Sequence, residues 1–250
     1  MSDFEPDFDV IVVGGGCAGS IAAYTLPSAG KTVLVVERGQ YSGAKNMTGG
    51  RIYTHSLAQV FPDTWKEAPL QRKVAHERIS LMAPDSNFTI DFTSRELEED
   101  KNASYTVLRA PFDQWLAEQA ENAGAEYIYG IAVEDLIIED GKVCGINAFG
   151  DELRSHVVIL ADGVNSLLTS KAGLSKYAPA TNEVAVGAKE TISLPAEVIE
   201  SRFLCNPGEG ASWLFAGSVS NGVIGGAFIY ANEDSISLGI VATMSEVLKQ

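Results

Sequence analysis

The sequence predicts an α/β fold in which a Rossmann-like βαβ unit is joined to a largely antiparallel sheet. Residues 9–13 (DVIVV) and 32–37 (TVLVVE) are short, apolar and β-branched, which is typical of parallel strands covered on both faces. Between them, three consecutive glycines precede an apolar helical repeat that ends near Gly30, with Pro27 expected to tighten or end the helix. A strand, a glycine turn, a helix and a second strand within about 30 residues form a βαβ unit.

Composition excludes several classes of protein. The chain has 250 residues, of which 46% are hydrophobic and 20% charged, so it can bury a large core. Its 18 basic and 33 acidic side chains give a net charge of −15, which disfavours nucleic acid and anionic membrane surfaces. No apolar run is long enough to span a membrane. Three scattered cysteines and three dispersed histidines indicate a reducing compartment and no metal site.

The middle of the chain alternates between loops, strands and one helix. Residues 40–76 are expected to be rich in loops. Residues 78–108 contain ERISLMA, NFTIDF and SYTVLRA, which predict antiparallel strands around a charged connection at 95–101. Pro111 suits a first helical turn, and the apolar stripe that follows predicts a helix ending at Gly124.

The rest of the chain is strand-rich. Residues 125–149 contain three strand patterns, the last two joined by Asp140-Gly141, a dipeptide that favours a type I′ hairpin turn. VVILADG then returns to the buried-strand pattern. Beyond Lys176, four strand-like segments and the Asn221-Gly222 turn signal predict an antiparallel sheet separate from the βαβ unit.

The first glycine turn carries a dinucleotide-binding pattern, Gly14-x-Gly16-x-x-Gly19. Gly14 permits the tight turn, Gly16 lets a pyrophosphate approach the backbone, and Gly19 allows close packing of helix on strand. Glu37 ends the next strand, where its carboxylate can accept hydrogen bonds from a ribose. NAD and FAD share this pattern, and a glycine turn beside an incidental glutamate is the structural alternative.

Three later motifs resemble those of known flavoproteins. Arg109 begins RxxFDxxL, Asp162-Gly163 lies in ADGxxS, and residues 43–53 read GAKNMTGGRIY. The first two are similar to motifs of the FAD-dependent monooxygenase and reductase superfamily, and residues 125–149 resemble its β-meander. The third resembles the signature of FixC-type dehydrogenases, relatives of electron-transfer-flavoprotein:quinone oxidoreductases. The likeness extends over essentially the whole chain.

The resemblance implies a glutathione-reductase-type FAD-binding fold with a β-meander and a partial antiparallel substrate-domain sheet. The FAD-binding domain would comprise residues 1–77 and 102–175, and the partial substrate domain residues 78–101 and 176–250. The family's third motif, a Gly-Asp pair at the start of a C-terminal helix, has no counterpart between Lys176 and Gln250. The chain is therefore expected to be part of a longer protein, or to obtain the part of the FAD site that this motif forms from another chain.

The resemblance also assigns roles to residues. The alternatives without a ligand are that Arg109 is a surface residue, that Asp162 caps a turn or helix, and that Lys45 and Arg51 are solvated charges. Cys17 is expected to be a small packing residue rather than a reactive thiol. The ADP half of FAD would be held by Gly14, Gly16, Cys17, Ala18, Gly19, Glu37 and Arg38, the adenine would meet the backbone of Val133, the pyrophosphate and ribityl chain would lie near Arg109, Asp162 and Gly163, and the flavin ring would lie beside Lys45, Gly49, Gly50 and Arg51.

By this resemblance the protein is an FAD-dependent oxidoreductase that passes electrons between an electron-transfer flavoprotein and a quinone or ferredoxin-type acceptor. A ferredoxin-like protein is an expected further partner. Two alternatives remain: a geranylgeranyl-reductase-like flavoenzyme, and a truncated dinucleotide-binding module or subunit without catalysis. The expected location is cytoplasmic, and peripheral attachment to the inner face of the membrane would need parts outside this chain.

Overall fold

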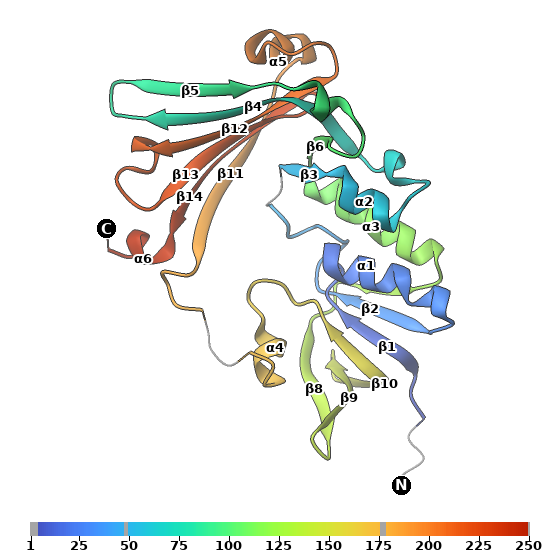
Figure 1. Ribbon diagram of the computed structural model, residues 1–250. Coiled ribbons are helices and arrows are strands. Elements are labelled where there is room, and N and C mark those ends of the chain that lie inside the picture. The colour runs from blue at the N-terminus through green and yellow to red at the C-terminus, as the bar shows by residue number, and fades with distance from the viewer. Residues whose placement is uncertain (1–4, 48–49, 176–178, 250) are drawn as a thin grey trace. The chain divides into compact units, whose positions relative to one another are not determined.

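Two sheets organise the chain in the computed structural model, which describes residues 5–47, 50–175 and 179–249 (Figure 1). Each sheet belongs to one of two compact units, and each unit is assembled from two separate stretches of chain. The first unit comprises Met1–Asn46 and Ala110–Ala178, and the second comprises Met47–Arg109 and Pro179–Gln250. The predicted α/β fold class, with parallel and antiparallel strands, is confirmed.

The first unit is built on a six-stranded sheet of order β7-β2-β1-β10-β9-β8. The neighbouring pairs from β7 to β10 are parallel, and β10-β9 and β9-β8 are antiparallel. Its elements are β1 (Phe8–Val13), α1 (Cys17–Thr25), the 3₁₀ turn η1 (Pro27–Ala29), β2 (Val33–Glu37), α3 (Arg109–Asn122), β7 (Glu126–Tyr129), β8 (Val133–Glu139), β9 (Lys142–Ala148), β10 (Asp151–Leu160) and α4 (Leu167–Lys171).

The parallel strands are buried on both faces, as their apolar sequences predict. On one face, Val12 and Val35 pack with Ala23 of α1 and Ala120 next to the end of α3. On the other face, the alternate residues of β1 and β2 pack with the β8–β9 hairpin. Because both faces carry apolar side chains, the two strands lack the polar alternation of a half-exposed sheet.

Local turns in the first unit follow the sequence signals. α1 ends at Thr25, and the chain tightens into η1 from Pro27, because proline removes a helical hydrogen bond at this point. Asp140 and Gly141 have φ angles of 49° and 76°, which is the left-handed pair that a type I′ turn requires. The predicted hairpin between β8 and β9 is therefore confirmed.

The second unit is built on an eight-stranded sheet of order β11-β14-β13-β12-β4-β6-β3, with β5 also paired to β4. Only the β12-β4 pair of this path is parallel. Its elements are β3 (Arg51–Tyr53), α2 (Thr54–Val60), η2 (Trp65–Glu67), β4 (Leu70–Met82), β5 (Asn87–Phe92), η3 (Arg95–Glu98), β6 (Ser104–Val107), β11 (Ala185–Ser193), α5 (Ala196–Phe203), β12 (Glu209–Gly217), η4 (Ser218–Ser220), β13 (Gly225–Ala231), β14 (Ser235–Thr243) and α6 (Met244–Val247).

Several elements differ from the sequence predictions. β7 pairs in parallel with β2, so the antiparallel meander consists of β8, β9 and β10 rather than the three strands within residues 125–149. The predicted loop-rich segment 40–76 contains β3, α2 and the start of β4, and α5 was not predicted. α5 is short, and Ile199 and Phe203 hold it by packing on Ala211 and Ala231 of the sheet. Tertiary packing, rather than local periodicity, therefore specifies this helix.

The boundaries of the units also differ from the expected ranges. Residues 47–77 and 102–109 were grouped with the dinucleotide-binding part, but they lie in the second unit. The reason is hydrogen bonding: β3 pairs with β6, β6 pairs with β4, and all three belong to the eight-stranded sheet. No helix among the described residues is long and apolar enough to cross a membrane.

Candidate dinucleotide-binding site

The glycine turn after β1 has the geometry that its sequence predicts. Gly14 has a φ angle of +103°, and its amide donates to the Val36 carbonyl at 2.9 Å. A Cβ at Gly14 would overlap with the carbonyl oxygen of Ala161. The turn can therefore form only around a residue without a side chain.

Gly16 is the N-cap residue of α1, where the helix leaves backbone amides without intrahelical acceptors. A Cβ built on Gly16 would have one neighbouring atom within 4 Å, the side-chain amide nitrogen Nδ2 of Asn46 at 3.9 Å. No protein atom therefore fills the space beside Gly16. An anion can approach the amides here, and the partial positive charge of the helix N-terminus favours it.

The third glycine of the pattern brings helix and strand together. A Cβ at Gly19 would overlap with the carbonyl of Gly14 and lie 3.2 Å from Cγ1 of Val12. Cys17 and Ala18 form the first turn of α1 between these glycines, and Ala18 is exposed. The first turn of the helix therefore stands directly over the end of β1.

Glu37 stabilises the same turn from the end of β2. Its Oε2 accepts from the Gly15 amide at 2.8 Å, and its Oε1 accepts from the Gly39 amide at 2.6 Å. Each carboxylate oxygen can accept further bonds, so a ribose acceptor role is compatible with this geometry. The neighbouring Arg38 is exposed.

A half-buried tyrosine supports the glycine turn, and it was not among the predicted site residues. The Tyr127 hydroxyl donates to Oγ of Ser20 at 3.1 Å, and Ser20 Oγ donates to the Gly15 carbonyl at 3.2 Å. Burial raises the pKa of Tyr127 above its ordinary value. The phenol thus stays protonated at physiological pH and acts as a donor.

The loop after β10 lies beside the glycine turn, because β10 and β1 are parallel neighbours. The carboxylate of Asp162 accepts from the amides of Leu168 and Thr169 at 2.9 and 3.2 Å and from the Thr169 hydroxyl at 2.8 Å. Asp162 therefore caps the short helix α4, which was one of the two interpretations of this residue. Gly163 has a φ angle of +76° in the exposed part of the loop.

A second set of contacts joins α1, α3 and the loop after β2. Asp113 of α3 is fully buried. Its carboxylate accepts from the Cys17 thiol at 3.3 Å and from the Asn46 side-chain amide at 2.5 Å. The signal was present, since Asp113 is the aspartate of RxxFDxxL and Asn46 lies in GAKN, but neither residue was among the predicted site residues.

Residues expected beside the flavin ring lie mostly in the second unit. Arg51 Nε donates to the Ser104 hydroxyl at 2.8 Å, its guanidinium forms an ion pair with Glu77, and it lies 4.6 Å from the ring centroid of Tyr53. Its side chain is only 13% exposed, so it is not a freely solvated loop charge. Gly50 is buried against the Tyr230 ring, which leaves no room for a Cβ.

The remaining predicted residues are distributed over both units. Lys45 is exposed in the first unit, and Gly49 lies outside the described residues. Arg109 is the half-buried first residue of α3, and Val133 is the half-buried first residue of β8. Their roles toward a cofactor stay predictions.

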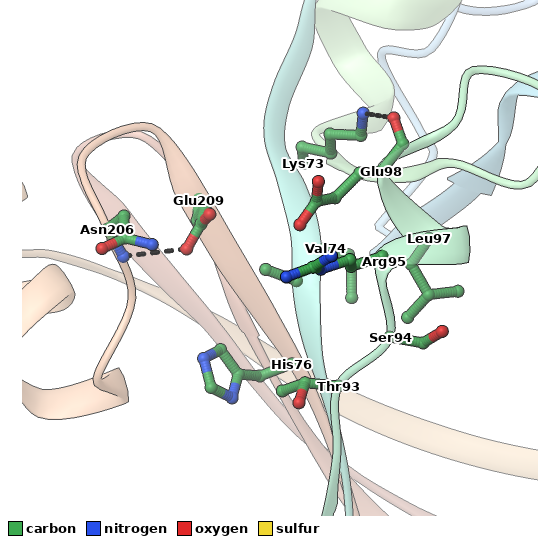
Figure 2. A pocket seen from close by; sticks show the side chains of 11 residues that line it. Lys73, Val74, His76, Thr93, Ser94, Arg95, Leu97, Glu98, Asn206 and Glu209 are labelled. Carbon is green, nitrogen blue, oxygen red and sulfur yellow. Dashed lines mark hydrogen bonds between the residues drawn. The ribbon is translucent and has the colours of Figure 1, made fainter.

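A separate cavity of about 360 Å³ lies in the second unit (Figure 2). Figure 2 shows the Lys73 ammonium donating to the Glu98 carbonyl, and the Asn206 backbone amide donating to the Glu209 carboxylate. The distance from Asn206 N to Glu209 Oε2 is 2.9 Å. Acidic and basic groups both line it, so its charge does not select one class of ligand. None of the predicted site residues is among those that line it: Lys73, Val74, Ala75, His76, Thr93, Ser94, Arg95, Leu97, Glu98, Asn206 and Glu209.

Comparison with known proteins places the chain in a family. Residues 9–191 match the family described as FAD dependent oxidoreductase. The chain belongs to the FAD-dependent oxidoreductase family. FAD is accordingly its cofactor, and the described turn suits the ADP half of FAD, because Gly16 leaves open space at the N-terminus of α1.

Named relatives of this oxidoreductase confirm the resemblance to FixC-type proteins. It is 51% identical over 237 residues to the protein FixC of Salmonella typhi, and 50% identical over 249 residues to the probable electron transfer flavoprotein-quinone oxidoreductase YdiS of Escherichia coli. These matches cover 95% and 99% of the chain but 55% and 57% of the relatives. The chain thus spans little more than half the length of the curated relatives it matches.

Solved structures share the fold at lower identity. A geranylgeranyl bacteriochlorophyll reductase-like protein from Thermoplasma acidophilum matches with a TM-score of 0.78 and 24% identity, over 96% of this chain and 57% of that one. The myxobacterial chondrochloren halogenase matches with a TM-score of 0.73 and 21% identity, over 97% and 54%. At these identities the likeness shows the fold alone. Among the described residues, no group of three or more His, Cys, Asp or Glu side chains could hold a metal ion.

Proposed function

We propose that this flavoprotein takes part in electron transfer between an electron-transfer flavoprotein and a quinone or ferredoxin-type acceptor. The observation that carries the proposal is about 50% identity to FixC and YdiS over almost the whole chain. When bound, FAD supplies the redox chemistry. A ferredoxin-like protein remains a proposed further partner.

We propose that the first unit's part is to bind and orient the ADP half of FAD. The amides of the first turn of α1 offer donors to the pyrophosphate, with Gly16 leaving room for it. Glu37 offers its carboxylate to the adenosine ribose while holding the amides of Gly15 and Gly39. In this proposal, Arg109, Val133 and the Asp162-Gly163 loop keep their expected places near the pyrophosphate, the adenine and the ribityl chain.

An electron-transfer assay tests the proposal directly. The purified protein is loaded with FAD, and its reduction by reduced electron-transfer flavoprotein and its oxidation by a soluble quinone are followed from the flavin absorbance. Reduction by the flavoprotein and reoxidation by the quinone are expected. Reduction of a prenyl double bond without either reaction would favour the geranylgeranyl-reductase alternative, and bound FAD without turnover would favour a binding module.

We also propose a cytoplasmic location for the protein. The three cysteines, Cys17, Cys144 and Cys205, form no disulfide with one another, which suits a reducing compartment. Fractionation of cells that produce the protein would test this location, with a soluble and a membrane fraction compared.

A further inference from the structure

The side chain of Asp113 occupies an unusual place for an acidic residue. Its side chain is fully buried, and burying a polar group is costly unless hydrogen-bond partners surround it. Two of its donors come from distant parts of the chain: the Cys17 thiol at the start of α1, and the Asn46 amide at 2.5 Å. Asp113 thereby joins α3, the glycine turn and the loop after β2 within the first unit.

This contact determines which way the Asn46 amide points. Asn46 turns its side-chain nitrogen, Nδ2, rather than its oxygen toward Asp113 and donates to Oδ2. The same nitrogen would lie 3.9 Å from a Cβ at Gly16, which places it beside the N-cap of α1. An amide nitrogen carries two N–H groups, and the bond to Asp113 uses one of them.

We propose that Asp113 is a positioning residue of the dinucleotide site, which holds the Asn46 amide so that its second N–H is a donor for the diphosphate of FAD. The proposal rests on the dinucleotide-binding function of the Gly14–Gly19 turn. Asn46 is the group that touches the ligand, and Asp113 acts through it. The bond from Cys17 ties the first residue of α1 to the same carboxylate, so the helix amides and the Asn46 amide are held in one arrangement.

A double-mutant cycle on ligand affinity tests this role. Calorimetric titration with ADP and with FAD is made on the parent chain, on Asp113→Asn, on Asn46→Ala and on the double variant. Each single change is expected to weaken ADP and FAD binding about 10-fold to 100-fold, the range for a hydrogen bond to a charged group. The double variant is expected to bind no more weakly than the weaker single variant, because both changes remove the same donor.

Controls separate positioning from folding. Gln114→Ala changes the next residue of α3, whose amide bonds to the Ala110 carbonyl at 3.0 Å, and it is expected to bind as the parent does. Unfolding in urea is measured for each variant without ligand. A purely structural Asp113 would shift the unfolding midpoint and leave the affinity of the folded fraction unchanged.

Two results would overturn the inference while leaving the dinucleotide site intact. One is parent-like affinity in folded Asn46→Ala, whatever happens to the Asp113 variants. The other is additive losses in the double variant, which would show that Asp113 and Asn46 act independently. Binding of neither ADP nor FAD by the parent chain would instead overturn both the site and the inference.

Discussion

Gly14 and Gly16 lie two residues apart in one turn, yet a side chain would have different consequences at each. At Gly14 the left-handed backbone and the Ala161 carbonyl both oppose a Cβ. At Gly16 the φ angle is −77°, and the nearest atom to a Cβ is 3.9 Å away. Gly14 is therefore needed for folding, whereas Gly16 is needed for the space that a ligand would occupy.

A Gly16→Val substitution is expected to leave the chain folded and to abolish binding of ADP and FAD. The valine fits against the protein but stands where the pyrophosphate must approach the helix amides. Calorimetry measures the affinity and circular dichroism the fold. The matched control is Gly14→Ala, which should destabilise the native state by about 1–3 kcal/mol through backbone strain. Unchanged affinity in folded Gly16→Val would contradict the assignment of this turn.

Replacing Glu37 is expected to weaken FAD binding by roughly 1.5–3 kcal/mol, the contribution of a charge-assisted hydrogen bond. The wild-type chain should also prefer FAD to NADP, because the carboxylate repels a 2′-phosphate. The Glu37→Ala change also removes the acceptor of the Gly15 and Gly39 amides, so Glu37→Gln, which keeps the size of the side chain, is the better control. Both affinities are measured by titration, and tighter binding of NADP would refute the prediction.

At the scale of elements, Arg72 of β4 fastens α5 to the second sheet. Its guanidinium donates to Glu200 of α5 at 2.8 Å and to the carbonyls of Asn232, Glu209 and Glu233 at 2.6 to 3.0 Å. The Arg72 side chain is buried, so these acceptors replace water around its charge. The bond from Arg72 is the main reason that the pKa of Glu200 lies below its ordinary value.

This ion pair predicts a loss of stability in acid. A folded-state pKa below the unfolded value, about 4.3 for glutamate, stabilises the protein above that pH, and the stabilisation disappears as the pH falls through the lowered pKa. Glu200→Gln should therefore lower the Tm at pH 7, and its difference from the parent should shrink below about pH 4. Thermal unfolding across this range measures it, with exposed Glu190→Gln as control. A Tm difference between Glu200→Gln and the parent that is equal at pH 7 and below about pH 4 would argue against a stabilising ion pair between Arg72 and Glu200.

Elements with a local signal could be predicted from the sequence, and those held by distant contacts could not. The apolar run DVIVV followed by a glycine turn specifies β1 and α1, and Asp140-Gly141 specifies the β8–β9 hairpin. The partner of β7 could not be predicted, because EYIY fits a parallel or an antiparallel neighbour equally well. At the site, the spacing of the glycines predicts their role. The contacts of Tyr127 with Ser20 and of Asp113 with Cys17 could not be predicted, because these residues come from elements far apart in the sequence.

At the scale of the whole molecule, one face of the second sheet exposes a continuous apolar surface. The pairing of β5, β4 and β12 brings Phe88 next to Leu81, and Ile90 next to Ile79, which in turn neighbours Leu214. All five side chains are exposed, Phe88 by 62%. Leu238 and Ile240 of β14 are also exposed, but they lie on the opposite face of the sheet, because Gly239 pairs with Phe228 and Phe228 pairs with Leu214. A contiguous apolar surface of this kind favours association.

The chain is therefore expected to self-associate in a concentration-dependent way. Substituting both Phe88 and Ile90 with threonine should reduce association, because β5 lies at a sheet edge and threonine keeps the strand propensity. Sedimentation velocity over a range of concentrations measures the effect. Val164→Thr is the control, since Val164 is 83% exposed but lies in the first unit. A wild-type chain that stays monomeric at all concentrations would refute this prediction.

The 250 residues by themselves are expected to hold FAD weakly. The first unit supplies the turn for the ADP half, but the Gly-Asp motif that the resemblance places near the flavin has no counterpart between Lys176 and Gln250. A flavin ring without that wall would lose burial and hydrogen bonds to its polar edge. Flavin absorbance after gel filtration measures retention, and ADP affinity close to FAD affinity is the expected signature. Stoichiometric FAD after gel filtration would show the prediction to be wrong.

The interleaving of the two units has a consequence for the synthesis of the protein. Val10 pairs with Val157, and Lys73 pairs with Glu209, so each sheet waits for a strand that leaves the ribosome much later. Chains emerge from the N-terminus, and parallel pairs between distant strands form slowly. The first sheet can close once β10 has been made, while β4 still lacks its partner β12. During that interval the nascent chain presents an unpaired apolar strand edge, which is the surface that molecular chaperones bind.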